Sequence, residues 1–136
     1  MDRREASLGI DLGTSGVKVA LVDAEGMVLA AAAHPCAVRS PRPGWAETPP
    51  AQWAVAARAA VAEVLSTCPD VQVIAVGIDG QMHGVVLVCG ATPVRDAILW
   101  PDSRADAELA LWRAVPEAVL ATLANPLTAG TPRPCL

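Results

Sequence analysis

Two short stretches of the sequence combine glycines with side chains that could bind a ligand. The first, GTSG, follows Asp11 closely at the end of an apolar segment. Its glycines, Gly13 and Gly16, free the backbone to take positive φ and let an anion approach the main-chain amides, while Thr14 and Ser15 add hydroxyl donors. This combination is typical of a loop that binds phosphate.

Asp11 itself stands within a segment that we predict to be a buried strand. Because a buried carboxylate without a partner is costly, we expect a cation or strong donors beside it, and a magnesium ion would serve. The alternative is an ordinary hairpin turn that Asp11 caps through local hydrogen bonds. The patterns G-x-x-x-x-G-K-[ST] and G-x-G-x-x-G do not occur here, so these other nucleotide motifs fit worse.

The second stretch, GIDGQMHG, places Gln81, Met82 and His83 between two glycines, directly after the apolar segment 71–78. Open α/β sheets bind ligands at the carboxyl ends of their strands, which is where these side chains are predicted to lie. Polar groups there could hydrogen-bond the hydroxyls of a small substrate, and Met82 could form an apolar wall. The alternative is that His83 is a solvated loop residue.

A third group, Trp100, Asp102 and Arg104, forms a W-x-D-x-R pattern. An indole offers a flat wall to the C–H face of a sugar, and an aspartate with an arginine can orient hydroxyls or each other. Asp102 could equally cap a helix that begins near Ser103. We predict that the other tryptophans are packing residues: Trp45, Trp53 and Trp112.

The elements that position these residues are predicted from hydrophobic periodicity. Residues 8–33 are predicted to form three antiparallel strands joined by the turns GTSG and DAEG. The apolar segment 71–78 is predicted to be a strand covered on both faces, which implies a mixed sheet. A helix is predicted from Thr48 to about Cys68, after a proline-rich surface loop. Further short elements are expected as strands at 85–88 and 97–100 and helices at 103–114 and 116–124.

Composition limits the classes of function. The chain has 136 residues, of which 53% are hydrophobic, and this suits one globular domain. Its net charge is −4, with one lysine and scattered arginines, so we expect no nucleic-acid partner. No apolar run of membrane-spanning length and no secretory signal is evident, which predicts a cytoplasmic protein without a membrane partner. The separated cysteines argue against a zinc site.

Five stretches of the sequence carry a family resemblance. GIDLGTSGVKVAL resembles the first phosphate motif of the actin-like ATPase superfamily, and GIDGQMHG followed by ILWPDSRA resembles the xylulokinase branch of the FGGY carbohydrate kinases. GWAETPPAQW and NPLTAGTP resemble that branch as well. The motifs occur in family order and span nearly the whole chain from Leu8. Asp79 departs from the pattern of this branch, in which small or hydroxyl residues are more familiar, and it adds a negative charge near the expected cleft.

The resemblance implies an α/β fold that is RNase H-like (actin-like ATPase), with a mixed sheet flanked by helices. It implies transfer of the γ-phosphoryl group of ATP, with magnesium, to D-xylulose or a related sugar. Asp11 would hold the metal through water, and Gly13, Thr14, Ser15 and Lys18 would contact phosphate. The residues implied to bind the sugar are Gln81, Met82, His83, Trp100, Asp102 and Arg104.

Full-length members of the family are several times longer, and their catalytic aspartate, second phosphate motif and adenosine motif fall beyond residue 136. Residues 1–136 are therefore expected to form the amino-terminal part of the first domain, inactive alone, of a parent that could be a homodimer. Two alternatives stay open. The parent could act on another polyol or sugar acid, or the chain could be a truncated, non-catalytic nucleotide-binding or interaction product.

Overall fold

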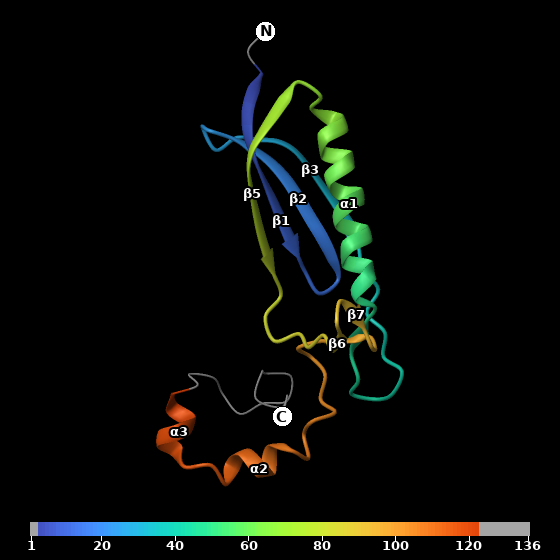
Figure 1. The fold of residues 1–136 in the computed structure, drawn as a ribbon, viewed down its shortest axis with the longest axis vertical. Coiled ribbons are helices and arrows are strands. Elements are labelled where there is room, and N and C mark those ends of the chain that lie inside the picture. The colour runs from blue at the N-terminus through green and yellow to red at the C-terminus, as the bar shows by residue number, and fades with distance from the viewer. Residues whose placement is uncertain (1–2, 123–136) are drawn as a thin grey trace. The chain divides into compact units, whose positions relative to one another are not determined.

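The computed structural model describes residues 3–122, which form two compact units (Figure 1). Within this range, unit 1 contains residues 3–37 and 51–81, and unit 2 contains residues 38–50 and 82–122. The motif NPLTAGTP and the end of the helix predicted at 116–124 lie outside the described residues. No helix in the described range is both long enough and apolar enough to cross a membrane.

Unit 1 is built on a four-stranded sheet with the order β3-β2-β1-β5. β1 and β2 form an antiparallel hairpin across the GTSG turn, β2 and β3 form a second one, and β5 returns parallel to β1. The predicted mixed sheet is therefore confirmed. Its strands are β1 (Arg4–Leu12), β2 (Gly16–Asp23), β3 (Val28–Pro35) and β5 (Val71–Gly80).

One helix, α1 (Pro50–Thr67), packs against this sheet, within about two residues of its predicted ends. Proline at the first helical position costs no hydrogen bond, and Pro69 disfavours helix at Cys68, where the helix has ended. Every fourth residue of α1 faces the sheet, and the resulting core contains Ala56, Ala60 and Val64 from the helix with Ala6, Leu8, Val17, Val19, Leu21, Ala32 and Cys36 from the other elements and the loop after β3.

The prediction that residues 71–78 are covered on both faces is wrong. β5 is an edge strand of the described sheet, and α1 covers a single face of that sheet (Figure 1). Val76 is 57% exposed and Ile78 is 69% exposed. Apolar content alone therefore overestimated the burial of this strand, because it does not say how many layers lie beside a sheet.

Unit 2 consists of short pairings rather than a continuous sheet. β4 (Glu47–Thr48) pairs antiparallel with β8 (Ala97–Ile98), and β6 (Val88–Cys89) pairs with β7 (Thr92–Pro93). An isolated bridge joins Val85 to Ile98.

The helix predicted at 103–114 is shorter in the structure, where α2 covers Leu109–Arg113 and turns precede it. Asp102 accepts a hydrogen bond from the amide of Arg104, which holds the chain in a turn at that point. The final predicted helix is represented by α3 (Glu117–Ala121).

Candidate active site

The GTSG turn is closed by a hydrogen bond from the amide of Gly13 to the carbonyl oxygen of Gly16, at 2.9 Å. A Cβ atom on Gly13 would lie 2.9 Å from that same oxygen, and one on Gly16 would lie 2.7 Å from the carbonyl oxygen of His34. Both positions thus exclude a side chain. The predicted reason, positive φ, is wrong, because among the described glycines only Gly26, Gly44 and Gly90 take positive φ.

Three contacts hold this loop to its surroundings within unit 1. The indole Nε1–H of Trp53, on α1, donates to the carbonyl oxygen of Gly13 at 3.2 Å. The amide of Cys36 donates to the carbonyl oxygen of Ser15 at 2.9 Å, and the hydroxyl of Thr14 donates to Oε1 of Gln81 at 2.9 Å. Trp53, which was predicted only to pack, therefore also fixes the loop through a hydrogen bond that periodicity does not reveal.

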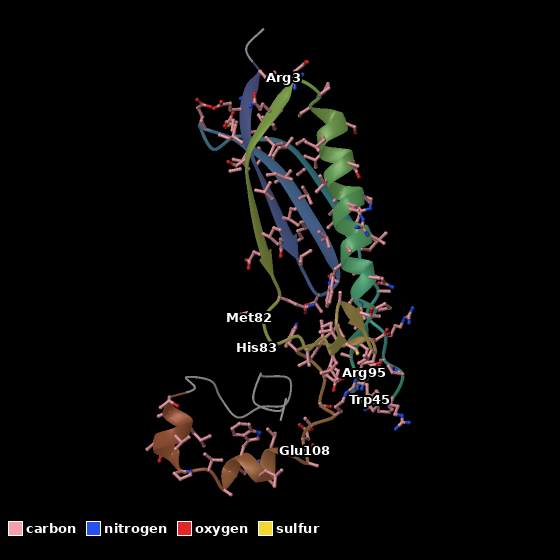
Figure 2. All side chains as sticks on the ribbon, viewed as in Figure 1. Arg3, Trp45, Met82, His83, Arg95 and Glu108 are labelled. Atoms are coloured by element: carbon pink, nitrogen blue, oxygen red, sulfur yellow. The ribbon has the colours of Figure 1, made fainter. Side chains whose placement is uncertain are left out.

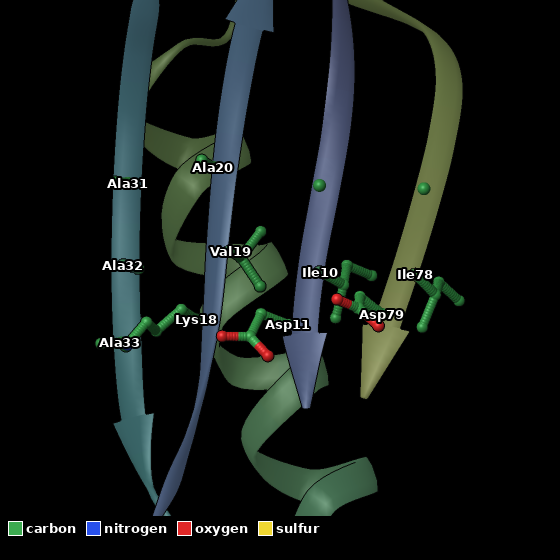
Figure 3. A pocket seen from close by; sticks show the side chains of 12 residues that line it. Ile10, Asp11, Lys18, Val19, Ala20, Ala31, Ala32, Ala33, Ile78 and Asp79 are labelled. Atoms are coloured by element: carbon green, nitrogen blue, oxygen red, sulfur yellow. The ribbon is translucent and has the colours of Figure 1, made fainter. Parts of the chain in front are cut away.

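A row of three charged residues crosses the sheet beside the loop. In the strand register, Asp11 of β1 lies between Lys18 of β2 and Asp79 of β5, as Figure 3 shows. The row lines an open depression on the face opposite α1. Much of its lining consists of residues without large side chains: Gly9, Ala20, Ala31, Ala33 and Gly77.

The structure corrects the predicted burial of Asp11. Its side chain is exposed, because no described element covers the face of the sheet on which it lies. Within residues 3–122, its carboxylate takes part in no hydrogen bond or ion pair. Burial of Asp11 therefore gives no reason to expect a partner for its carboxylate. The turn-capping alternative has no hydrogen bond to support it, and the free oxygens fit a hydrated magnesium ion.

Unit 2 contains a compact group of opposite charges. Glu47 is 8% exposed and Asp102 is 3% exposed. Nη2 of Arg104 lies 2.8 Å from a carboxylate oxygen of Glu47 and 2.6 Å from one of Asp102, and its Nε donates to Asp102 at 2.7 Å. Arg95 also pairs with Glu47. Two carboxylates and two guanidinium groups thus neutralise one another.

Backbone and aromatic contacts complete this group. The amide of Ala46 donates to Asp102 at 2.7 Å, and the guanidinium of Arg104 stacks 3.7 Å from the ring centre of Trp45. Arg42 approaches the same ring at 4.9 Å. Figure 2 labels Trp45 and Arg95 in this region. Sequence reasoning treated Trp45 as packing and overlooked Glu47 and Arg95, since partners 48 or more residues apart leave no local signal.

The environment shifts the proton affinity of this pair. Burial alone would raise the pKa of Asp102, but hydrogen bonds from the Arg104 side chain and the Ala46 amide outweigh it and leave the pKa below its ordinary value. Hydrogen bonding to Asp102 raises the pKa of Arg104 further above its ordinary value. Both groups are therefore charged near neutral pH.

His83 is the single described non-glycine residue with positive φ, at 64°. This backbone conformation is uncommon for residues other than glycine and marks positions where the surroundings impose it. Next to it, Met82 is 74% exposed, and elsewhere in unit 2 Trp100 is 52% exposed. The bridge between Val85 and Ile98 joins the segment after His83 to the segment before Trp100.

The structure therefore divides the predicted sugar-binding set. Gln81 is hydrogen-bonded to Thr14 of the glycine loop, in unit 1. Met82 and His83 belong to unit 2, as does the W-x-D-x-R segment. Within that segment, Asp102 and Arg104 contact each other, as one reading of their pattern predicted.

Comparison with known proteins identifies the family of this chain. Residues 6–134 match the model of the FGGY family of carbohydrate kinases, N-terminal domain. The chain belongs to this family. Kinases of the family use ATP.

Among curated proteins, xylulose kinase of Escherichia coli strain K12 is 43% identical over 117 residues, covering 85% of this chain and 24% of that protein. Glycerol kinase of Aquifex aeolicus is 33% identical over 101 residues, covering 73% of this chain and 20% of that protein. The chain thus spans about a quarter or less of the length of these relatives.

Solved structures agree on the fold. A xyloylose kinase from Brucella ovis superposes with a TM-score of 0.88 at 36% identity, covering 96% of this chain and 27% of that chain. Glycerol kinase of Plasmodium falciparum with ADP, at 23% identity, has a TM-score of 0.74 and covers 82% of this chain and 23% of that chain. The predicted α/β, actin-like ATPase fold, present as part of a domain, is confirmed.

Proposed function

We propose that this chain is the amino-terminal part of a kinase that transfers the γ-phosphoryl group of ATP to D-xylulose and yields xylulose 5-phosphate. The observation that carries the proposal is the free carboxylate of Asp11, which lies between Lys18 and Asp79 beside a tightly closed glycine loop. The names of the relatives that match at 36–43% identity support xylulose as the acceptor.

In this proposal the glycine loop and the charged row serve the nucleotide. The loop is closed tightly at Gly13 and Gly16, and its tip residues, Thr14 and Ser15, are assigned to the phosphate side of the site. The ammonium of Lys18 adds positive charge beside them. Asp11 would hold magnesium through water, and the metal, when bound, would neutralise charge on the phosphate oxygens.

The sugar is assigned to unit 2. His83 would hydrogen-bond a sugar hydroxyl, Met82 would supply an apolar contact, and the exposed indole of Trp100 would cover a C–H face. Asp102 and Arg104 would act on the sugar mainly by fixing the segment that follows Trp100, since Asp102 binds Arg104 and Arg104 also binds Glu47.

Several features of the parent protein stay proposals. We assign residues 1–136 to the front part of the first kinase domain, and we assign the general base that deprotonates the sugar hydroxyl to no residue of this chain. The 136-residue chain by itself is accordingly expected to form no xylulose 5-phosphate. A homodimeric parent in the cytoplasm remains a prediction.

The test uses a kinase of full family length that carries this chain as its amino-terminal segment, here called the full-length kinase. ADP release and sugar phosphate are measured with D-xylulose, glycerol and gluconate, each with ATP and magnesium. We expect kcat/KM for D-xylulose to exceed that of the other two at least tenfold. The 136-residue chain serves as the negative control.

Other outcomes favour the alternatives. A preference for glycerol or gluconate would assign the parent to another sugar or polyol, as the glycerol kinase relative allows. Absence of ATP turnover with every acceptor, together with a stop codon directly after Leu136 in the gene, would favour a non-catalytic product. Xylulose 5-phosphate formed by the 136-residue chain alone would refute the assignment of the base.

A further inference from the structure

Gln81 directly follows β5, at the same end of the sheet as the glycine loop. Its amide nitrogen donates to the carbonyl oxygen of Leu12 at 3.0 Å, which continues the pairing of β5 with β1 by one residue. Its side-chain oxygen Oε1 accepts the hydroxyl of Thr14 at 2.9 Å. Gln81 is thus fixed to unit 1 through both its backbone and its side chain.

This contact determines which atoms are left for a ligand. A threonine hydroxyl has one proton to donate, and here that proton points to Oε1 of Gln81. While this bond is made, the Thr14 oxygen can only accept. Phosphate oxygens are acceptors too, so the Thr14 hydroxyl in this arrangement cannot be the donor that a phosphate group needs.

The other half of the Gln81 amide supplies what Thr14 lacks. Nε2 carries two N–H bonds, is buried, and has no hydrogen-bond partner among the described residues. A buried donor without a partner costs free energy. In native proteins such a group is commonly explained by a ligand, an ion or a water that binds it. This donor without a partner, Nε2, belongs to the same Gln81 side chain that contacts the glycine loop through Thr14.

From these contacts we infer that Gln81 is a nucleotide-phosphate ligand rather than a sugar ligand. Its Oε1 orients the Thr14 hydroxyl, and its Nε2–H donates to an oxygen of the β-phosphate, which ATP and ADP share. This inference rests on the proposed kinase function and refines it. It moves Gln81 from the sugar set, where its neighbours Met82 and His83 remain, to the phosphate set.

The decisive variant is Gln81→Met, which keeps the length of the side chain and removes both its donor and its acceptor. In the full-length kinase we expect the KM for ATP to rise about tenfold or more, since a hydrogen bond to a charged group is lost. The KM for D-xylulose should stay within twofold. Gln72→Met, at an exposed position of the same strand, is the matched control and should leave both values unchanged.

Two further measurements separate binding from folding and from sugar chemistry. Affinity for ADP with magnesium, measured by calorimetry without sugar, should fall about tenfold in Gln81→Met and remain normal in Gln72→Met. The melting temperature should change little. Thr14→Ser keeps the hydroxyl and should retain ADP affinity, whereas Thr14→Val combined with Gln81→Met should weaken binding by less than the product of the two single effects.

A rise in the KM for D-xylulose with unchanged ATP and ADP values would overturn the inference and return Gln81 to the sugar set. Unchanged values for all ligands would overturn it as well. ADP binding does not depend on the acceptor, so a wild-type kinase that binds ADP but prefers another sugar would refute only the proposed substrate. A wild-type kinase that does not bind ADP would refute both.

Discussion

The two units build their candidate sites by different means. In unit 1 the glycine loop joins adjacent strands, and the charged row follows from the strand register, so neighbours in sequence or in the sheet create the site. In unit 2 the charged residues come from segments about 50 residues apart and bind one another. From this difference we predict that the unpaired carboxylate of Asp11 faces a ligand, whereas the paired charges of unit 2 support the structure around a site.

The largest effect that tests this comparison is expected at Asp11. Asp11→Asn in the full-length kinase should lower kcat by about a thousandfold, because the charge that would hold magnesium at the phosphates is lost. The melting temperature should hardly change, since the side chain is exposed and makes no described contact. Steady-state kinetics and thermal unfolding measure both values.

Asp70→Asn, at an exposed turn of the same unit, is the control and should leave kcat unchanged. A large loss of melting temperature with preserved turnover in Asp11→Asn would instead favour the turn-capping role of Asp11.

The opposite response is expected at Asp102, whose charge supports structure. Asp102→Asn should lower the free energy of unfolding at pH 7 by about 2–3 kcal/mol, because it weakens hydrogen bonds to the charged Arg104 side chain. Urea unfolding of the full-length kinase, followed by tryptophan fluorescence, measures the loss.

The same variant has a predicted pH dependence. The fold lowers the pKa of Asp102, so its stabilisation is fully present above the ordinary aspartate pKa of about 4 and is lost as pH falls through the lower folded value. The difference in stability between wild type and Asp102→Asn should therefore close in acid. A gap that stays constant down to pH 2 would contradict the role of the charge.

A smaller effect should distinguish the glycines of unit 1. Gly16→Ala should cost roughly 1–2 kcal/mol of stability, because its Cβ atom would lie 2.7 Å from the carbonyl oxygen of His34. Gly77→Ala is the matched control, since a Cβ atom there meets nothing within 4 Å. Equal unfolding midpoints for the two variants would show that the loop relaxes without cost.

An effect of about the same size, on sugar turnover rather than on stability, is expected at His83, in unit 2. His83→Ala should lower kcat/KM for D-xylulose about tenfold, roughly 1.4 kcal/mol, and leave the KM for ATP unchanged. His34→Ala, at the other histidine, should change neither, because that side chain binds Glu63 of α1. An ATP-specific defect in His83→Ala would contradict the assignment of His83 to the sugar.

Much of unit 1 could be predicted because its interactions are short-range or periodic. Alternation in β1 and β2 indicated which residues face the core, and Pro50 with Pro69 bounded α1. The exposure of Asp11 and of β5 could not be predicted. Alternation identifies the two faces of a sheet, but it does not say whether a second layer covers the outer face. The close packing at Gly13 and Gly16 could not be predicted either, since close backbone approach depends on the neighbouring strand.

The sequence by itself determined the family, the mixed sheet and the residues in the glycine loop, because each of these depends on local pattern or on motif order. Only the tertiary structure decided how the polar residues are shared. It joined Gln81 to Thr14 and Arg104 to Glu47 across 67 and 57 positions of the chain, contacts that hydrophobic periodicity does not encode. A hydrogen bond forms between groups that are close in space. The folded structure therefore decides which polar group is left without a partner and available to a ligand.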